Sequence, residues 1–261
     1  MKITTNRKAA IEKAKIYNKK GIAVSISFLP VRAYKKEETG DDITEYLALF
    51  DDIPRHGLNA DVTIKFMQFG ALTNTLLIRE SLKHILTKGR ETKTRIWFDQ
   101  ELNWIVDDVI DIATEQDPSD VGICFQAFRS RTLKDLGRAA GYPIRLVKGF
   151  YNDYDIRPWS KVTENYSVLM DEVAKQSSYP CFATHDYALI EKAKKILKEK
   201  DGEIQFFAGV RDDLASELVK EGYKVRIYLP YGQVFQFLWY GFPIFDMPRA
   251  LQRVAHLAKI H

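Results

Sequence analysis

The sequence has little cysteine and lacks long apolar segments. Its 261 residues include two cysteines, Cys124 and Cys181, and each lies in a short apolar run without a second cysteine at metal-binding spacing. This pattern predicts two buried free thiols, which suit a reducing compartment. No apolar stretch reaches the length needed to span a bilayer, and the first twenty residues are too polar for a signal peptide. We therefore expect a cytoplasmic protein.

The sequence also lacks a strong charge of one sign. There are 39 basic and 35 acidic residues, so the formal net charge is +4. No block of lysine and arginine is interleaved with aromatic residues, and we therefore expect no nucleic-acid partner. Two nucleotide-binding signatures are missing as well, because no GxGxxG turn follows the first apolar segment and no GxxxxGK[ST] loop occurs.

Eight short apolar or β-branched segments alternate with stretches of helical spacing. The apolar segments are Ile22–Pro30, Val62–Met67, Thr94–Asp99, Gly122–Phe128, Ile144–Gly149, Cys181–His185, Glu203–Gly209 and Lys224–Pro230. Near-continuous apolar strands between amphipathic helices are typical of a parallel sheet covered by helices. The count and the length predict an α/β fold, a single (β/α)8 barrel domain over residues 1–261, with an extra helix in the first twenty residues. A doubly wound open sheet is the alternative.

Nine polar residues lie at the predicted carboxyl ends of these strands, where barrel enzymes carry their active sites. They are Lys65, Asp99, Gln126, Arg145, Lys148, Thr184, His185, Gln205 and Tyr228. Singly, several have structural explanations: Arg145 and Asp99 could form a buried ion pair, and His185 could be a core histidine. Together they indicate a ligand site, because charged groups are costly in an apolar barrel unless they are paired or engaged by a ligand.

The residue types narrow the chemistry of this site. One carboxylate and one histidine are fewer ligands than a metal site uses, so we predict no metal. A Schiff base on Lys65 or Lys148 would suit a lyase, whereas glutamines and an arginine would suit a flavin ring. The pattern leaves both open. Arg145 and Lys148 are an odd number of residues apart and should point to opposite faces, unless the strand bends or ends near Lys148, which Gly149 permits.

The strand-end motifs, taken in order, resemble those of the proline dehydrogenase family, which includes the PutA-type domain. They are VTIKF, FDQE, GICFQAF, RLVKGFY, FATHD and the segment from Glu203 that ends in VRIYLPYG, within a resemblance spanning Ile22 to Tyr240. The resemblance implies a barrel that binds FAD and transfers a hydride to it from the carbon next to the nitrogen of proline. Electrons would pass to a quinone, through peripheral contact with a membrane.

The same resemblance implies roles for individual residues. Those expected to bind FAD are Gln126, Arg145, Lys148, Thr184, His185 and Gln205. Those expected to line the substrate pocket and serve catalysis are Lys65, Asp99, Arg145, Tyr228 and Tyr240. The two glutamines would contact the flavin ring, Arg145 would lie near its reactive nitrogen, and Lys148 would lie on the ribityl-phosphate side.

The sequence departs from the family at the substrate carboxylate. The family motif Tyr-x-x-Arg-Arg holds this group, but here Pro243 and Ile244 follow Tyr240 where the arginines belong. We therefore expect proline to saturate weakly, and less polar cyclic amines to serve comparably, unless Arg249 or Arg157 replaces the pair. The alternatives are a dehydrogenase for another cyclic or secondary amine, a flavin-binding protein without dehydrogenase activity, and a lysine Schiff-base lyase.

Overall fold

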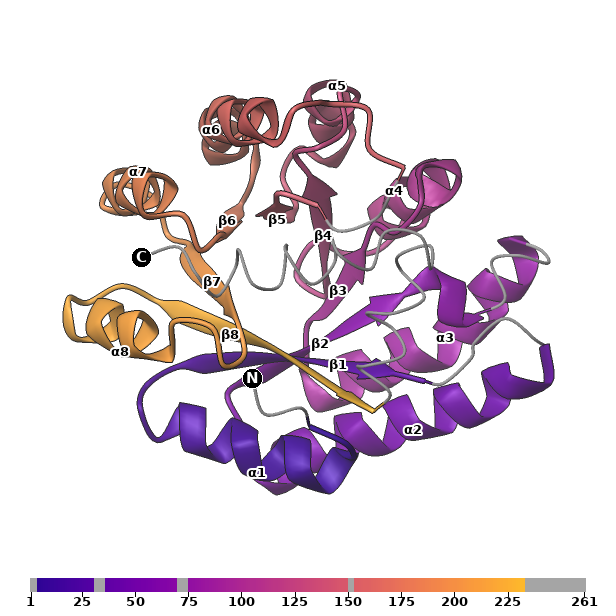
Figure 1. Ribbon diagram of the computed structural model, residues 1–261. Coiled ribbons are helices and arrows are strands. Elements are labelled where there is room, and N and C mark those ends of the chain that lie inside the picture. Colours follow the sequence, from indigo (N-terminus) through magenta and orange to yellow (C-terminus); the bar gives the residue numbers. More distant parts are fainter. Residues whose placement is uncertain (1–3, 31–35, 70–74, 150–152, 233–261) are drawn as a thin grey trace.

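The computed structural model describes residues 4–30, 36–69, 75–149 and 153–232, which form a closed barrel of eight parallel strands (Figure 1). Neighbouring strands follow the order of the chain, and β8 pairs with β1 to close the sheet. The strands are β1 (Ala23–Leu29), β2 (Ala60–Lys65), β3 (Ile96–Asp99), β4 (Val121–Gln126), β5 (Pro143–Val147), β6 (Tyr179–Ala183), β7 (Glu203–Phe207) and β8 (Val225–Gly232). The predicted barrel is confirmed, and each predicted strand end agrees within two residues.

Helices lie between the strands and surround the barrel (Figure 1). The α-helices are α1 (Arg7–Asn18), α2 (Lys36–Arg55), α3 (Thr75–Thr92), α4 (Val106–Thr114), α5 (Thr132–Leu136), α6 (Trp159–Gln176), α7 (Tyr187–Leu197) and α8 (Asp212–Lys220). Short 3-10 helices are η1 (Phe66–Phe69), η2 (Asn103–Ile105) and η3 (Gly137–Ala139). Within the described parts of the chain, none of these helices is long and apolar enough to cross a membrane.

The extra N-terminal helix, α1, is confirmed and packs on the outside of the barrel beside β1 and β8. Its start is fixed by Asn6, whose Oδ1 accepts a hydrogen bond from the amide of Ala9 at 2.9 Å. Its buried residues recur at helical spacing and are Ala10, Ile11, Ala14 and Tyr17. The helix therefore covers the strand junction where the barrel closes.

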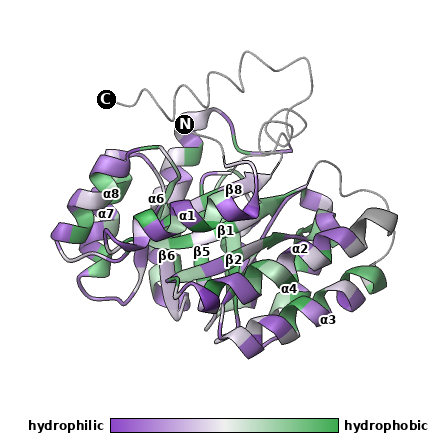
Figure 2. Ribbon diagram, turned by 90° about the horizontal axis from the view of Figure 1, so that it is seen from below, coloured by the Kyte–Doolittle hydropathy of each residue, from purple (hydrophilic) through white to green (hydrophobic). Residues whose placement is uncertain are grey.

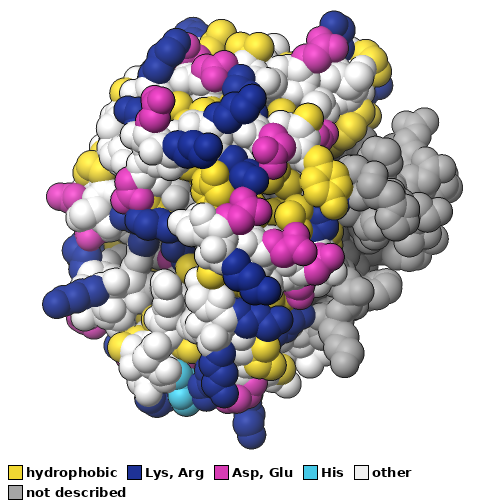
Figure 3. Space-filling view, turned by 90° about the vertical axis from the view of Figure 1, so that its left-hand side faces the viewer, with side chains coloured by type: hydrophobic (Ala, Val, Ile, Leu, Met, Phe, Trp, Pro, Cys, Tyr) yellow, Lys and Arg dark blue, Asp and Glu magenta, His cyan; other side chains and the backbone are white. Residues whose placement is uncertain are grey.

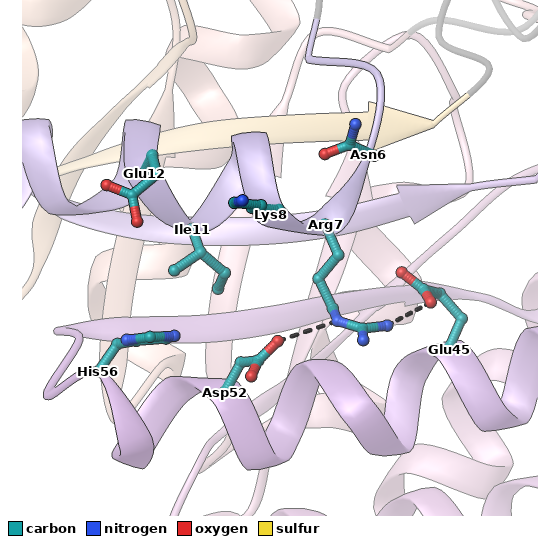
Figure 4. Close-up of a pocket in the computed structure, with 8 residues that line it drawn as sticks. All are labelled: Asn6, Arg7, Lys8, Ile11, Glu12, Glu45, Asp52 and His56. Carbon is teal, nitrogen blue, oxygen red and sulfur yellow. Dashed lines mark hydrogen bonds and ion pairs between the residues drawn. The ribbon is translucent and has the colours of Figure 1, made fainter.

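A hollow of about 600 Å³ separates α1 from α2 on this outer surface (Figure 4). Arg7 reaches across it, with Nε donating to Asp52 Oδ2 at 2.9 Å and Nη1 paired with Glu45. The hydroxyl of Tyr231 on β8 donates to Glu45 at 2.9 Å. These bonds join α1, α2 and β8 beside the place where β8 pairs with β1.

Each strand presents two different faces. The residues that face the helices are apolar and fully buried, such as Ile64, Phe98 and Leu146, and Figure 2 shows hydrophobic residues concentrated in the central strands. The alternate residues face the barrel interior and are mostly polar, as the cross-barrel contacts described below establish. The expectation of near-continuous apolar strands is therefore wrong for the inner face, because side chains alternate along a strand and the interior is a polar layer. Both cysteines are buried free thiols, as predicted.

Surface charges of both signs are mixed over α7 and α8 (Figure 3). Lys192 on α7 pairs with Asp171 of α6 at 2.8 Å, and Lys194 on α7 pairs with Glu221 after α8 at 2.8 Å. Lys192 and Lys194 on α7 therefore both have acidic partners on neighbouring elements.

Candidate active site

Polar side chains from most strands meet inside the barrel. Asp99 on β3 is the register partner of Lys65 on β2 and of Cys124 on β4, so the three side chains share one face of the sheet. Cys124 is in turn the register partner of Arg145 on β5. Because Arg145 also contacts β1 and β2 across the barrel, this shared face is the interior.

Lys65, Asp99, Tyr228 and Arg145 form one hydrogen-bonded cluster, which we call the upper cluster. The ammonium of Lys65 pairs with Asp99 Oδ2 and donates to the hydroxyl of Tyr228 at 3.0 Å. Arg145 Nη1 lies 3.4 Å from Asp99 Oδ1. Two cations share one carboxylate, so the charges of the cluster sum to +1. The structure therefore brings together four of the five residues predicted to serve catalysis.

The positions of three predicted residues along their strands need correction. Arg145 and Gln205 are the third of five residues in β5 and β7, and Tyr228 is the fourth of eight in β8. They were expected at strand ends. The strands continue past them, and Arg145 and Tyr228 have side chains long enough to reach Asp99 at the end of β3.

Burial governs the ionisation of the upper cluster. Lys65 is 4% exposed, so its ammonium is buried away from water. Burial alone would lower the pKa of Lys65, but the nearby groups of Asp99, Tyr228 and Glu101 together outweigh it and raise the pKa well above its usual value. Lys65 therefore stays charged, which disfavours its use as a Schiff-base nucleophile because that role needs a neutral amine.

Arg145 is held mainly by neutral partners. Nη2 donates to Ser25 Oγ at 2.8 Å, and Nη1 donates to Thr63 Oγ1 at 3.1 Å. The two hydroxyls also lie 2.8 Å apart, so they form a fixed pair beneath the guanidinium. The ion pair with Asp99, predicted as a structural alternative, does form, but at 3.4 Å it is the longest of these contacts.

A second polar layer lies deeper in the barrel and was missed by the sequence analysis. Arg226 on β8 pairs with Asp61 on β2 at 3.0 Å and with Glu203 on β7 at 2.6 Å. Asp61 also accepts a hydrogen bond from Trp97 Nε1 at 2.6 Å. A signal was present in the sequence, since Arg226, Glu203 and Trp97 each stand two positions from a recognised residue on the same strand, and Asp61 stands four positions from Lys65.

The two glutamines predicted to contact a flavin ring are both buried and both engaged by the protein. Gln126 Nε2 donates to the carbonyl oxygens of Gln100 and Glu101 at 3.1 and 3.2 Å. Gln205 Nε2 donates to Glu203 Oε1 at 2.6 Å. These bonds fix the orientation of the two amides, and their contact with a cofactor stays a prediction.

Lys148 points away from the upper cluster, as the odd spacing from Arg145 predicted. The strand β5 ends at Val147, and the ammonium of Lys148 donates to Thr163 Oγ1 at 2.9 Å and lies 3.3 Å from Asp186 Oδ2. Gly149 has φ of 124°, and a Cβ there would lie 1.5 Å from the ring of Phe128. The turn after β5 therefore requires glycine and sends Lys148 toward α6 and α7.

His185 and Thr184 lie in the short connection between β6 and α7. Thr184 Oγ1 accepts a hydrogen bond from the amide of Asp186 at 3.2 Å. His185 Nε2 accepts one from the amide of Phe207 at 3.3 Å, and burial, together with the charges of Arg211 and Lys148, lowers the pKa of His185 to about 4. His185 is therefore neutral at neutral pH, between two cations.

The remaining predicted residues fall elsewhere. Tyr240, Pro243, Ile244 and Arg249 lie outside the described residues. Arg157, a predicted replacement cation, lies with its guanidinium 4.5 Å from the centre of the Tyr154 ring. Among the described residues, no group of three or more His, Cys, Asp or Glu side chains could hold a metal ion.

Among the buried polar atoms that have no hydrogen-bond partner within the described residues, three belong to residues at or next to the predicted cofactor site. They are Gln100 Nε2, Arg145 Nε and His185 Nδ1. Buried polar atoms are nearly always paired, so such groups are candidates for ligand contacts. The guanidinium of Arg145 and the nearby amides suit the heterocycle of a flavin dinucleotide. The two cations near the neutral His185 suit its phosphates. The residues present therefore fit FAD.

Comparison with known proteins gives one consistent family. The family model described as "Proline dehydrogenase" matches residues 10–241. Proline dehydrogenase 2 of Bacillus subtilis (strain 168) is 28% identical over 253 residues, which is 92% of this chain and 81% of the relative. Proline dehydrogenase of Deinococcus radiodurans is 28% identical over 261 residues, 90% of this chain and 80% of the relative.

Solved structures agree on the fold. Proline utilization A (PutA) from Bdellovibrio bacteriovorus, inactivated by N-propargylglycine, aligns with a TM-score of 0.79 at 17% identity over 92% of this chain and 31% of its own. PutA from Corynebacterium freiburgense also gives 0.79, at 18% identity, over 96% of this chain and 30% of its own. The present chain thus spans about a third of these PutA chains, and the likeness shows the barrel fold.

Proposed function

This chain belongs to the proline dehydrogenase family, and we propose that it binds FAD and oxidises proline, or a related cyclic secondary amine, at the carbon next to nitrogen. FAD, when bound, supplies the hydride acceptor. The electrons then pass to a quinone or a similar acceptor, through contact with the membrane periphery. The reaction is an oxidation of a CH–NH donor.

The upper cluster is the observation that carries this proposal. The four members of this cluster sum to +1 and are buried, where electrostatic interactions are strong. Glu101 and Asp61 also act on Lys65 and Arg145, so it is the two cations themselves, and not a net positive site, that suit negative charge on a substrate carboxylate or on a flavin ring that has accepted a hydride. Asp99, together with Tyr228 and Glu101, keeps Lys65 charged in spite of its burial.

Individual residues take the following roles in this proposal. Lys65, Asp99 and Tyr228 contact the substrate, and Tyr240 completes that pocket. Arg145 faces the flavin ring through its unpartnered Nε. The residues that hold the rest of the ring and the dinucleotide are Gln126, Gln205, Lys148, Thr184 and His185.

A spectrum of the purified protein tests cofactor binding. We expect flavin absorbance, with FAD identified by mass spectrometry after release. Anaerobic addition of proline should bleach this absorbance, and a soluble quinone analogue should restore it. A protein that stays colourless after incubation with excess FAD or FMN would remove the proposal.

A second candidate function is flavin binding without dehydrogenase activity. It is favoured by Pro243 and Ile244, which take the places of the family's carboxylate-binding arginines. The two candidates separate in the anaerobic experiment. Bleaching by any member of a panel of cyclic amines supports the dehydrogenase, whereas a yellow protein that none of them bleaches supports the second candidate.

A further inference from the structure

Arg145 rests against an aromatic ring that comes from a different strand. Its guanidinium carbon lies 4.4 Å from the ring centre of Trp97 on β3. Both side chains are almost fully buried, at 2% and 0% exposure. A guanidinium at this distance from an indole gains a cation–π interaction, which is stronger without water. Trp97 therefore limits where the guanidinium can lie.

Trp97 is itself fixed by a hydrogen bond from below. Its Nε1 donates to Asp61 Oδ2 at 2.6 Å, and the same oxygen lies 3.0 Å from Arg226 Nη1. Arg226 is anchored in turn, with Nε donating to Glu203 at 2.6 Å. The deeper polar layer thus ends in a fixed carboxylate that holds the indole ring in one orientation.

The neighbouring strand provides room for the ring. Gly122 on β4 is the register partner of Trp97, and a Cβ at this position would lie 2.5 Å from Trp97 Cζ3. No real side chain tolerates that distance. The indole therefore occupies the space of the missing side chain, which fixes the ring from a second direction.

The ion pair alone does not fix Arg145. Asp99 lies 3.4 Å from Nη1 and is also bound by Lys65, whereas Ser25 and Thr63 contact the guanidinium edge. These two hydroxyls restrain Arg145 within its own plane, and a flat ring restrains motion out of that plane. Two rings lie over the guanidinium, and Trp97, with its centre at 4.4 Å, is the closer one, because the centre of the Tyr228 ring lies 5.8 Å away.

We propose that Trp97 and Asp61 are positioning residues for Arg145, acting on the reaction only through the place of its guanidinium. The inference rests on the proposed function, in which Arg145 faces the flavin. It predicts that loss of the indole ring or of its hydrogen bond changes the flavin reduction potential, although neither group touches the flavin.

The test compares three variants with a control. Trp97→Leu removes the ring and the hydrogen bond, Trp97→Phe keeps a smaller ring without the hydrogen bond, and Asp61→Asn weakens the anchor. Phe98→Leu is the control, because Phe98 is adjacent in sequence and equally buried but faces the helices. The measurements are the flavin reduction potential, kcat and KM, a thermal melt, and a crystal structure of each folded variant.

We expect Trp97→Leu to lower the flavin reduction potential. It should also lower kcat about 10- to 100-fold with little change in KM, because a displacement of the reacting groups by about 1 Å can cost about 100-fold in rate. Trp97→Phe should shift both values in the same direction and less. Asp61→Asn should lower kcat less than Trp97→Leu, while the negative charge that it removes near Arg145 acts on the potential with the opposite sign. In the crystal structures, Arg145 should leave Ser25 and Thr63 in Trp97→Leu and stay in Phe98→Leu.

Two results would overturn the inference. One is a folded Trp97→Leu protein with Arg145 in place and an unchanged potential; the other is an equal shift in Phe98→Leu. If Trp97→Leu fails to fold, Trp97→Phe decides in the same way, and Asp61→Asn decides through kcat and the place of Arg145. A wild-type protein without flavin refutes the proposed function instead, and the place of Arg145 in the crystal structures still decides the positioning role.

Discussion

Replacing Asp99 with asparagine removes the carboxylate that Lys65 and Arg145 share. The side chain of Lys65 is 5% exposed and that of Asp99 is 12% exposed, so the pair is shielded from water. Removing one partner of a buried pair leaves the other charge uncompensated and costs about 3–5 kcal/mol of unfolding free energy. At roughly 2–4 °C per kcal/mol for a chain of this size, the melting temperature should fall by roughly 6–20 °C.

The assay is urea unfolding of the flavin-free protein followed by circular dichroism, with the free energy extrapolated to zero urea. The matched control is Asp201→Asn, which breaks an exposed pair with Lys224 and should cost less than about 1 kcal/mol. The double variant Lys65→Met/Asp99→Asn should be more stable than Asp99→Asn, because it removes one of the two buried cations that Asp99 neutralises.

If Asp99→Asn costs no more than Asp201→Asn, then Asp99 does not compensate Lys65 and Arg145 in a water-free site. If the double variant is no more stable than the single one, the loss comes from the changed side chain and not from the unpaired ammonium. Either result would also remove the charge argument for the proposed function.

Three further predictions concern single groups. The pKa of His185 falls from 6.5 to about 4 on folding, so the unfolded chain takes up a proton before the folded protein does as the pH is lowered. The free energy of unfolding of the flavin-free protein should therefore drop by about 3 kcal/mol between pH 6.5 and pH 4. Urea titrations of wild type and His185→Gln check this, and parallel curves of free energy against pH would contradict it. Arg145→Met should lower the flavin reduction potential by tens of millivolts. The reason is that one charge-assisted hydrogen bond is worth about 1.5–3 kcal/mol, and about 1.4 kcal/mol equals roughly 30 mV for a two-electron couple. An unchanged potential in a variant that still binds flavin would show that Arg145 points elsewhere. Loss of the arginine pair at Pro243 and Ile244 should weaken proline binding by about 2–5 kcal/mol, or roughly thirty-fold to several thousand-fold; steady-state kinetics against less polar cyclic amines test this, and a sub-millimolar KM with brisk turnover would reveal a replacement cation.

The sequence determined the order and type of the elements. Apolar segments such as Glu203–Gly209 and the helical spacing between them depend on neighbours a few residues away, so the pattern is local and readable. The opposite directions of Arg145 and Lys148 were predicted for the same reason, since alternation along a strand needs no tertiary contact. The motifs that gave the family are likewise short and continuous.

Tertiary structure decided which polar residues meet. Tyr228 reaches Lys65 because β8 returns to pair with β1, and that closure brings together residues 163 positions apart. The deeper layer around Arg226 was not predicted, because a single polar residue in an apolar run has the same local pattern whether it faces solvent or a partner across a barrel. The sequence shows which side chains share a face of a strand, but closure of the sheet alone turns that face inward, where burial makes their mutual pairing necessary.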